Sequence, residues 1–221
     1  MLQGNLHKTH PVLSVNRLAP MSSSIQRFLI LLCCLLLAGT GFLFFRLRNG
    51  VLIKAPQDKN ILSDTEIICY RQDDEQWGDD RLGDSQYTLR SSGCLVSCIA
   101  SALSMELNTA ETPGTLNMKL SSGQAYDAEG NLQWGQLSAL YDYQVNVYQE
   151  ISSDIIDNCL LEGRYPIVKV RMHALGSFHY VLITGIQNGR YLCMDPLRDE
   201  VTSLSSYGNW VYGIRCVSQY K

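Results

Sequence analysis

The sequence predicts an α+β domain that follows one membrane-spanning helix. In the middle of the chain, apolar residues recur at helical spacing. In the last third, short β-branched and aromatic runs alternate with turn residues, as in antiparallel strands. Helices followed by antiparallel strands are typical of the α+β class. An uncharged run near the N-terminus predicts the membrane helix.

That uncharged run covers residues 28–45, "FLILLCCLLLAGTGFLFF". As a helix it measures about 27 Å, close to a bilayer core of about 30 Å. Arg27 precedes it and Arg46 follows it, and their long side chains can reach the headgroups. A cleaved signal peptide is the alternative, but the run is longer than the usual apolar region of one and no A-x-A-like site closes it. We therefore expect a retained anchor.

The expected organisation is a cytoplasmic tail over 1–27, the transmembrane anchor over 28–45, a linker over 46–64 and a folded domain over 65–221. An N-terminal anchor usually leaves the following domain outside the cytoplasm. Basic residues on both sides of the anchor leave the positive-inside rule undecided. We expect a single-pass protein of the cell membrane with an extracytoplasmic domain.

Charge and cysteine usage limit the partners. The first 50 residues contain five of the 18 basic residues and no acidic one, which leaves 13 basic and 21 acidic residues and a net charge of −8. A net-acidic domain argues against nucleic acid as a partner.

No two cysteines show the CxxC spacing of zinc sites, so neither a metal nor a cofactor is expected. Outside the cell, disulfides are open, with no pairing fixed, among Cys69, Cys98, Cys159, Cys193 and Cys216.

The domain is expected to begin with a strand over 65–70 and an acidic, glycine-punctuated loop over 71–85. A helix follows from Cys94 to about Leu107, with Ser91 or Ser92 as its cap. Pro113 at a first helical position predicts another helix, which starts at Thr112-Pro113. Further helices are expected within 131–144 and 152–166. Strands are expected within 166–172, 178–186, 190–196 and 210–217.

Cys94 follows a Ser-Ser-Gly turn and stands at the head of a predicted helix. The N–H groups and the dipole of a helix N-terminus favour an anion, so they stabilise a thiolate, whose thiol has an ordinary pKa of about 8.5. The same amides can hold an oxyanion. Cys94 is therefore a candidate nucleophile, although a single cysteine at a helix start is more often structural.

His179 and Asp195 come close together if two predicted strands form a hairpin. His179 interrupts an otherwise apolar strand, and Asp195 closes the next one. A three-residue loop, Gln187–Gly189, is a known hairpin connection, and it places Asp195 opposite Val181. His179 is then a diagonal neighbour of Asp195 on the same face, within reach of a carboxylate–imidazole hydrogen bond. A thiol nucleophile needs such an oriented base.

Each of these residues alone also has a structural explanation, such as a satisfied core histidine or an aspartate that starts a turn. Among the other histidines, His173 in a loop-like segment is the main rival base, and His7 and His10 lie in the tail. Acidic side chains of the 71–85 loop could attract a basic substrate, but we expect them to be solvated surface: Asp73, Asp74, Glu75, Asp79 and Asp80.

Beyond these patterns, five segments resemble the bacterial cysteine peptidases of papain-like fold that are related to the double-glycine, bacteriocin-leader peptidases. The segments are "YRQDDEQWGDDRLGDS", "GCLVSCIASAL", "EGRYPIVKV", "GSFHYVLITGI" and "YLCMDP". The resemblance runs over roughly residues 67–217, with Cys, His and Asp in the family order. As a set these elements are specific, whereas any one of them is weak.

The resemblance implies a papain-like fold in which a nucleophile helix precedes an antiparallel sheet. It makes Cys94 the nucleophile, His179 the general base and acid, and Asp195 the residue that orients the imidazole. Gln72 looks like the family glutamine whose side-chain amide contributes to the oxyanion hole, and Gln76 is a nearby alternative. The chain departs from the family in a longer Gln–Cys separation and in having Leu-Val, instead of Gly-Pro, after the nucleophile.

The expected activity is hydrolysis of a peptide or amide bond by a membrane-anchored thiol hydrolase, through an acyl-thioester. Two alternatives stay open: a catalytically inactive extracytoplasmic binding module on the same fold, and an acyl transferase in which an amine replaces water. A leader peptidase coupled to an exporter is less favoured, because the chain has one apolar span and no nucleotide-binding loop. The identity of the peptide or amide substrate stays open.

Overall fold

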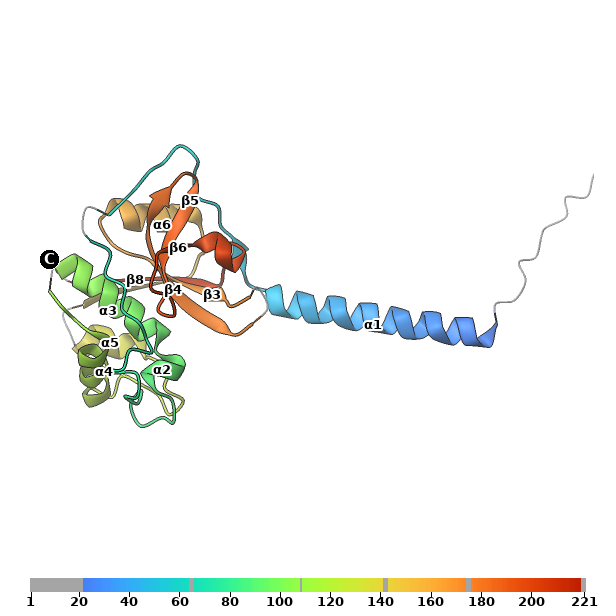
Figure 1. Ribbon diagram of the computed structural model, residues 1–221, viewed down its shortest axis with the longest axis horizontal. Helices are drawn as coiled ribbons and strands as arrows, with labels where there is room; N and C mark the ends of the chain where they lie inside the picture. The colour runs from blue at the N-terminus through green and yellow to red at the C-terminus, as the bar shows by residue number, and fades with distance from the viewer. Residues whose placement is uncertain (1–21, 64–65, 108, 141–142, 174–175, 220–221) are drawn as a thin grey trace, which may run out of the picture. The chain divides into compact units, whose positions relative to one another are not determined.

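The computed structural model describes residues 22–63, 66–107, 109–140, 143–173 and 176–219. The chain divides into two compact units, Met1–Arg46 and Leu47–Lys221. Helix α1 (Ser23–Leu47) forms the described part of the first unit (Figure 1). Within Ser23–Phe45 an 18-residue window has a mean hydropathy of 2.6, and none of that window is buried. By length and composition α1 could cross a membrane, and a signal sequence would have the same properties.

The second unit contains an antiparallel sheet whose described strands lie in the order β2-β8-β3-β4-β5-β6. Two short strands, β1 and β7, pair separately. The bounds are β1 Val51–Leu52, β2 Tyr143–Tyr148, β3 Ile167–Arg171, β4 Phe178–Gln187, β5 Arg190–Met194, β6 Thr202–Ser203, β7 Trp210–Val211 and β8 Gly213–Gln219. The predicted α+β class and antiparallel sheet are therefore confirmed.

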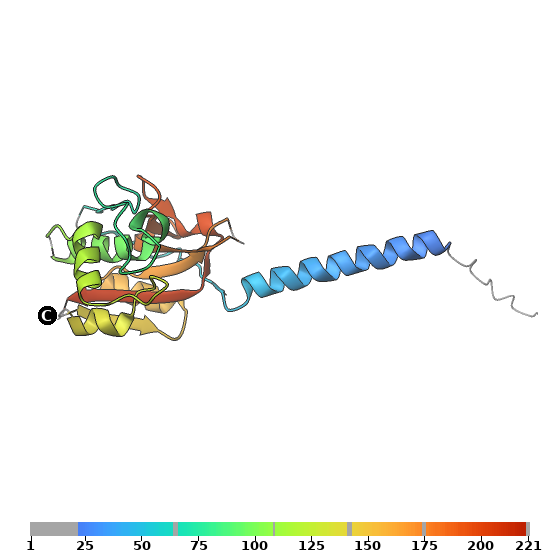
Figure 2. The ribbon, with the colours of Figure 1, turned by 90° about the horizontal axis from the view of Figure 1, so that it is seen from below.

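Helices cover both faces of this sheet. Ile99 of α3 shares one core with Ile167, and Ile156 of α6 shares another with Val168. Because successive residues of a strand point to opposite faces, α3 and α6 lie on opposite sides of β3. Figure 2 shows the green helices on one side of β8, which runs in red across the domain. The bounds are α2 Leu89–Ser92, α3 Cys94–Leu107, α4 Pro113–Ser122, α5 Trp134–Leu140, α6 Ser153–Leu161 and the 3₁₀ turn η1 Leu204–Tyr207.

Helix α3 begins at the predicted residue but is not capped as predicted. Ser91 belongs to the preceding helix α2, where it forms a capping box with Thr88: Thr88 Oγ1 accepts from Ser91 N at 3.4 Å, and Thr88 N donates to Ser91 Oγ at 2.9 Å. The predicted cap of α3 by Ser91 or Ser92 is therefore wrong. Between the two helices a Cβ on Gly93 would lie 2.5 Å from Leu89 O, so this junction requires glycine.

The first described residues of the second unit lie against the sheet. Val51 pairs with Val211, Ile53 is buried, and Ile61 N donates to Ile186 O at 3.0 Å. Much of the segment 46–64, expected to be a linker, thus packs on the domain. The strand expected over 65–70 is absent from its described residues, 66–70. Tyr70 N instead donates to Ser101 Oγ of α3 at 3.2 Å, because this stretch packs on a helix.

The remaining predicted elements agree with the structure, with one exception. The helix expected within 131–144 covers only Trp134–Leu140, and the alternating "YQVNVY" that follows forms β2. The other helices start as predicted, at Pro113 behind the cap Thr112 and at Ser153 behind the cap Ser152. The 71–85 segment contains turns and one isolated bridge rather than regular elements, as expected of a loop.

The β4–β5 hairpin has the predicted register near Asp195, but its turn differs from the predicted one. Gln187 pairs with Arg190, so the turn contains only Asn188 and Gly189, both with positive φ as in a type I′ turn. The predicted three-residue loop is wrong, and the first pairs are one residue out of the predicted register. A bulge at Thr184 removes the offset, so that Leu182 pairs with Met194 as predicted. Asp195, the next residue along this register, falls opposite Val181 and thereby shares a face with His179.

Candidate active site

Cys94 is the first residue of α3 and is half-buried. One turn further along the helix, Cys98 Sγ donates to Tyr180 O of β4 at 3.5 Å. This contact holds the N-terminal turn of α3 against β4, one residue beyond His179. The helix therefore brings the Cys94 thiol next to the imidazole, close enough to influence the pKa of His179.

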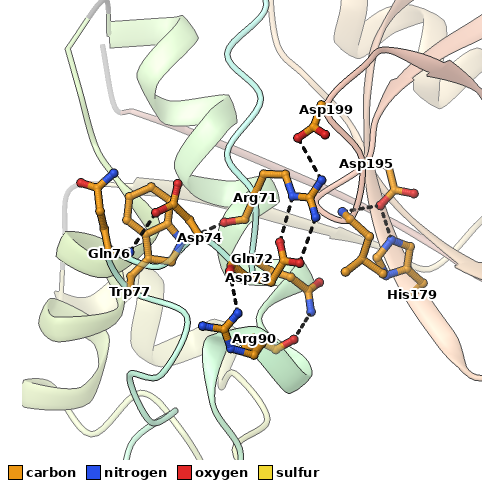
Figure 3. A network of polar contacts seen from close by, with 11 residues as sticks. Arg71, Gln72, Asp73, Asp74, Gln76, Trp77, Arg90, His179, Asp195 and Asp199 are labelled. Carbon is orange, nitrogen blue, oxygen red and sulfur yellow. Dashed lines mark hydrogen bonds and ion pairs between the residues drawn. The ribbon is translucent and has the colours of Figure 1, made fainter.

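His179 lies in β4, opposite Val170 of β3, and only 4% of its surface is exposed. Its Nε2 bonds Asp195 Oδ1 at 2.6 Å (Figure 3), so Nδ1 is the ring nitrogen that remains for Cys94. Burial alone would lower the pKa of His179, but the hydrogen bonds with Asp195 and Cys94 outweigh it and raise the pKa to about 9. The imidazole is therefore protonated at neutral pH, between a carboxylate and a thiol.

Asp195 is almost fully buried, and both of its carboxylate oxygens accept hydrogen bonds. Oδ1 accepts from His179 Nε2 and, at 2.9 Å, from Leu197 N. Oδ2 accepts from the Tyr207 hydroxyl and lies 3.4 Å from Arg198 Nε. Burial opposes ionisation, yet the hydrogen bonds from His179 and Tyr207 hold the pKa of Asp195 below its usual value. Asp195 is thus an ionised carboxylate that fixes the orientation of the imidazole.

Tyr207 is a site residue that sequence reasoning missed. It ends the η1 turn, whose cap is Ser203, and the left-handed Gly208 follows it. Hydrogen bonding to Asp195 raises the pKa of the Tyr207 phenol in addition to the increase caused by burial, so the phenol stays a donor. No local signal marks this tyrosine, because its partner Asp195 lies twelve residues earlier, just after β5, and only the chain's return beside β5 brings the two together.

Gln72 joins the two sides of the site. Its backbone N donates to Pro196 O at 3.0 Å, directly after Asp195. Its side-chain Nε2 donates to Arg90 O at 2.8 Å, in the short helix before Cys94. Figure 3 shows Gln72 between Arg90 and the His179–Asp195 pair. The amide of Gln72 keeps a second N–H, so it can donate to a group bound at the head of α3.

The other glutamine considered from the sequence, Gln76, is exposed. Its backbone N donates to Asp74 Oδ1 at 2.9 Å, in a turn on the outer side of the loop (Figure 3). The loop itself is tied to the domain by Trp77, whose Nε1 donates to Arg71 O at 2.7 Å. The structure therefore gives Gln72, and not Gln76, a place between the nucleophile helix and Asp195.

Two of the acidic side chains of this loop, Asp73 and Asp79, form ion pairs within the chain. Arg71 holds Asp73 through two hydrogen bonds of 2.9 Å and reaches Asp199 with its remaining nitrogen. Arg90 Nε lies 3.1 Å from Asp79. With these partners, Asp73 and Asp79 already have cations beside them, which agrees with a solvated structural loop rather than a site for basic substrates.

Among the histidines considered from the sequence, only His179 lies beside Cys94 in the described chain. His173 is exposed on the turn after β3, with a φ of 49°. His7 and His10 lie outside the described residues. All eight cysteines are described, and all are free thiols. In the described residues, no group of three or more His, Cys, Asp and Glu side chains could hold a metal ion.

Two buried thiols lie close together away from the site. The free thiol of Cys159 in α6 interacts with that of Cys216 in β8, and its sulfur lies 3.4 Å from the hydroxyl of Tyr148. A hollow of about 970 Å³ near them is bounded by Ile61, Glu106, Asn146, Leu160, Arg164 and Thr184. It contains none of the four predicted site residues. The predicted site residues therefore lie outside this hollow.

Comparison with the sequence profiles of known protein families finds no match for this chain, and a search of curated proteins finds no similar sequence.

Proposed function

We propose that this chain is a membrane-anchored thiol hydrolase that cleaves a peptide or amide bond through the triad Cys94, His179 and Asp195. The observation that carries the proposal is the buried 2.6 Å contact between His179 Nε2 and Asp195 Oδ1, in an imidazole that also interacts with Cys94. A nucleophile, a base and a group that orients the base are the three parts that acyl transfer to a thiol requires.

The order of these parts along the chain supports a papain-like arrangement. The nucleophile begins a helix, and the base and its carboxylate lie in a later antiparallel hairpin. This order matches the double-glycine peptidases that the sequence resembles. We therefore propose the papain-like fold for the second unit, and α1 as the single-pass anchor that keeps this unit outside the cytoplasm.

The proposed reaction begins with Cys94 as a thiolate facing the protonated His179. The sulfur attacks the amide carbonyl, and the oxyanion accepts hydrogen bonds from the first amides of α3 and the free N–H of Gln72. His179 Nδ1–H then protonates the leaving amine, and the C–N bond breaks to give a thioester. Next, Nδ1 takes a proton from water, whose oxygen attacks the thioester. The acid leaves, and Cys94 is regenerated as a thiolate.

The test is hydrolysis of a fluorogenic peptide mixture by the full chain in detergent micelles. We expect turnover that Cys94→Ala abolishes. We expect Gln72→Ala to lower kcat about 10²- to 10³-fold, as loss of one oxyanion donor does. Gln76→Ala is the matched control and should leave kcat unchanged, because this glutamine lies on the outer side of the loop.

Two results would contradict the proposal. Turnover that persists in Cys94→Ala would exclude the thiol mechanism. Absence of turnover by a folded wild-type chain, together with unaltered peptide binding by Cys94→Ala, would instead favour a binding module. Adding a primary amine to the same assay separates hydrolysis from transfer, since a transferase forms the amide product rather than the acid.

A further inference from the structure

A cluster of basic and aromatic side chains, formed by Lys169, Arg171, Phe178 and Tyr212, lies outside the catalytic triad. The β3–β4 register pairs Lys169 with Tyr180 and Arg171 with Phe178, so these side chains share the face of the sheet opposite to His179. Lys169 Nζ lies 4.0 Å from the Phe178 ring centre, and the Arg171 guanidinium lies 3.9 Å from it. We call these four residues the Phe178 patch.

The positive charge of the Phe178 patch is uncompensated in the described chain. Neither Lys169 nor Arg171 forms an ion pair with a described carboxylate, and the nearby Arg215 adds a third cation without one. Burial, Arg215 and Arg171 all lower the pKa of Lys169. Arg171 is nine-tenths buried, and its Nε has no hydrogen-bond partner. Such an arrangement is costly unless an anion from outside the domain compensates it.

The patch also exposes apolar and aromatic surface. The Phe178 side chain is 43% exposed, although it is a large aromatic residue on a domain with two well-formed cores. Tyr212 packs on it edge to face, with 5.3 Å between the ring centres. Aromatic rings beside lysine and arginine are typical of surfaces that lie in the headgroup layer of a membrane.

The chain between the apolar segment of α1 and this patch is short. Tyr212 packs directly on Gly50, where an added Cβ would lie 2.8 Å from the tyrosine ring. The apolar segment ends at Phe45, and two helical residues followed by three extended ones span at most about 14 Å. A headgroup layer is about 5–8 Å thick. If α1 spans a bilayer, the Phe178 patch is therefore held within reach of the headgroups of the same leaflet.

We propose that the Phe178 patch binds the anionic phospholipid headgroups of the bilayer that α1 spans. The lipid phosphates supply the negative charge that the domain lacks around Lys169 and Arg171, and Phe178 enters the interface. Since Phe178 directly precedes His179 in β4, the contact would orient the domain with its catalytic strand beside the membrane. This inference rests on the membrane-anchor part of the proposed function and is independent of the peptidase chemistry.

The experiment uses the full chain in lipid nanodiscs, either zwitterionic or containing anionic phospholipid. Amide hydrogen exchange is measured by mass spectrometry over β3 and β4. With anionic lipid we expect exchange there to slow about fivefold for each basic residue at the surface. High salt should remove this difference, since the contact is electrostatic. Lys169→Gln and Phe178→Ser should each reduce the protection.

Arg190→Gln is the matched control, because Arg190 is an exposed cation at the start of β5, beside the end of β4 far from Phe178, and should behave like the wild type. Equal exchange in both kinds of nanodisc would overturn the proposal, and so would an equal loss of protection in Arg190→Gln. Protection by a hexaglutamate peptide but not by anionic lipid would overturn it in favour of an acidic peptide partner. A chain that does not incorporate into nanodiscs would refute the anchor and this inference together, whereas an incorporated chain without a lipid effect refutes this inference alone.

Discussion

Asp195 accepts hydrogen bonds from three separate parts of the chain: His179 of β4, Leu197 of its own turn and Tyr207 of η1. This number of donors compensates the cost of burying a carboxylate. Oδ1 accepts from the backbone of the turn and from the imidazole at once, so the structure shows both contacts considered from the sequence.

Tyr207→Phe is expected to lower kcat/KM about ten- to a hundredfold, since a hydrogen bond to a charged group is worth about 1.5–3 kcal/mol. Without the phenol, the pKa of Asp195 rises, so the loss should increase as the pH falls. The measurement is the pH profile of kcat/KM. Tyr212→Phe is the control, because its buried hydroxyl has no hydrogen-bond partner and its removal should cost little. Equal profiles for Tyr207→Phe and the wild type would contradict this role.

The roles of individual residues could be predicted only where a residue stands out from its immediate neighbours in the sequence. Cys94 follows a glycine at a helix start, and His179 interrupts an apolar strand, so both stand out in the sequence. Tyr207 and the backbone carbonyl of Arg90 do not, because their roles depend on distant partners. The structure brings Cys94, His179, Asp195 and Gln72 together, and their catalytic roles stay predictions until activity is measured.

At the scale of elements, the β4–β5 hairpin shows why register is hard to predict from a turn alone. "QNG" admits both a two-residue and a three-residue turn, and the structure adopts the shorter one at Asn188-Gly189. The bulge at Thr184 then restores the predicted pairing further along. Gly185, beside the bulge, allows the backbone of Ile61 to approach, and that contact lies outside any local sequence signal.

Gly185→Ala is expected to lower the free energy of unfolding by about 1–3 kcal/mol, because the new Cβ would lie 2.5 Å from Ile61 O. The measurement is denaturant unfolding of the full chain in detergent micelles. Gly135→Ala is the matched control: this helical glycine has open space around it, so alanine should stabilise by about 0.5–1 kcal/mol. If both variants have wild-type stability, the close approach of residue 61 to β4 is wrong.

At the scale of the molecule, periodicity predicted the α+β class, the apolar helix and most helix positions. It could not predict the strand order, because β8 inserts between β2 and β3 through contacts far apart in sequence. Periodicity also did not predict that residues 51–61 pack on the sheet. This segment is short and interrupted by polar residues, so it has no alternating pattern that would predict strand pairing. The proposed papain-like fold and the anchoring role of α1 go beyond these observations.

For α1, we expect the chain recovered from cell membranes to retain the apolar segment. Its length matches a bilayer core, and it lacks a typical cleavage site. The measurement is the intact mass of the membrane-extracted protein, with N-terminal peptide mapping. A chain that begins shortly after Phe45 would show that the segment is a signal sequence and would remove the anchor.

The central claim, a thiol paired with an oriented imidazole, is tested most directly by iodoacetamide labelling of the full chain from pH 5 to 9, with peptide mapping. The pKa of His179 is raised to about 9, so the imidazole stays protonated through neutral pH and loses its charge only as the pH passes 9. A thiol facing that cation should alkylate well below pH 8.5. Cys69 is the internal reference, because it is also half-buried and burial raises its pKa.

We predict that Cys94 reacts well ahead of Cys69 at pH 6–7, and that His179→Ala removes this advantage. A Cys94 that reacts no faster than Cys69, or equally fast in His179→Ala, would contradict the proposed triad.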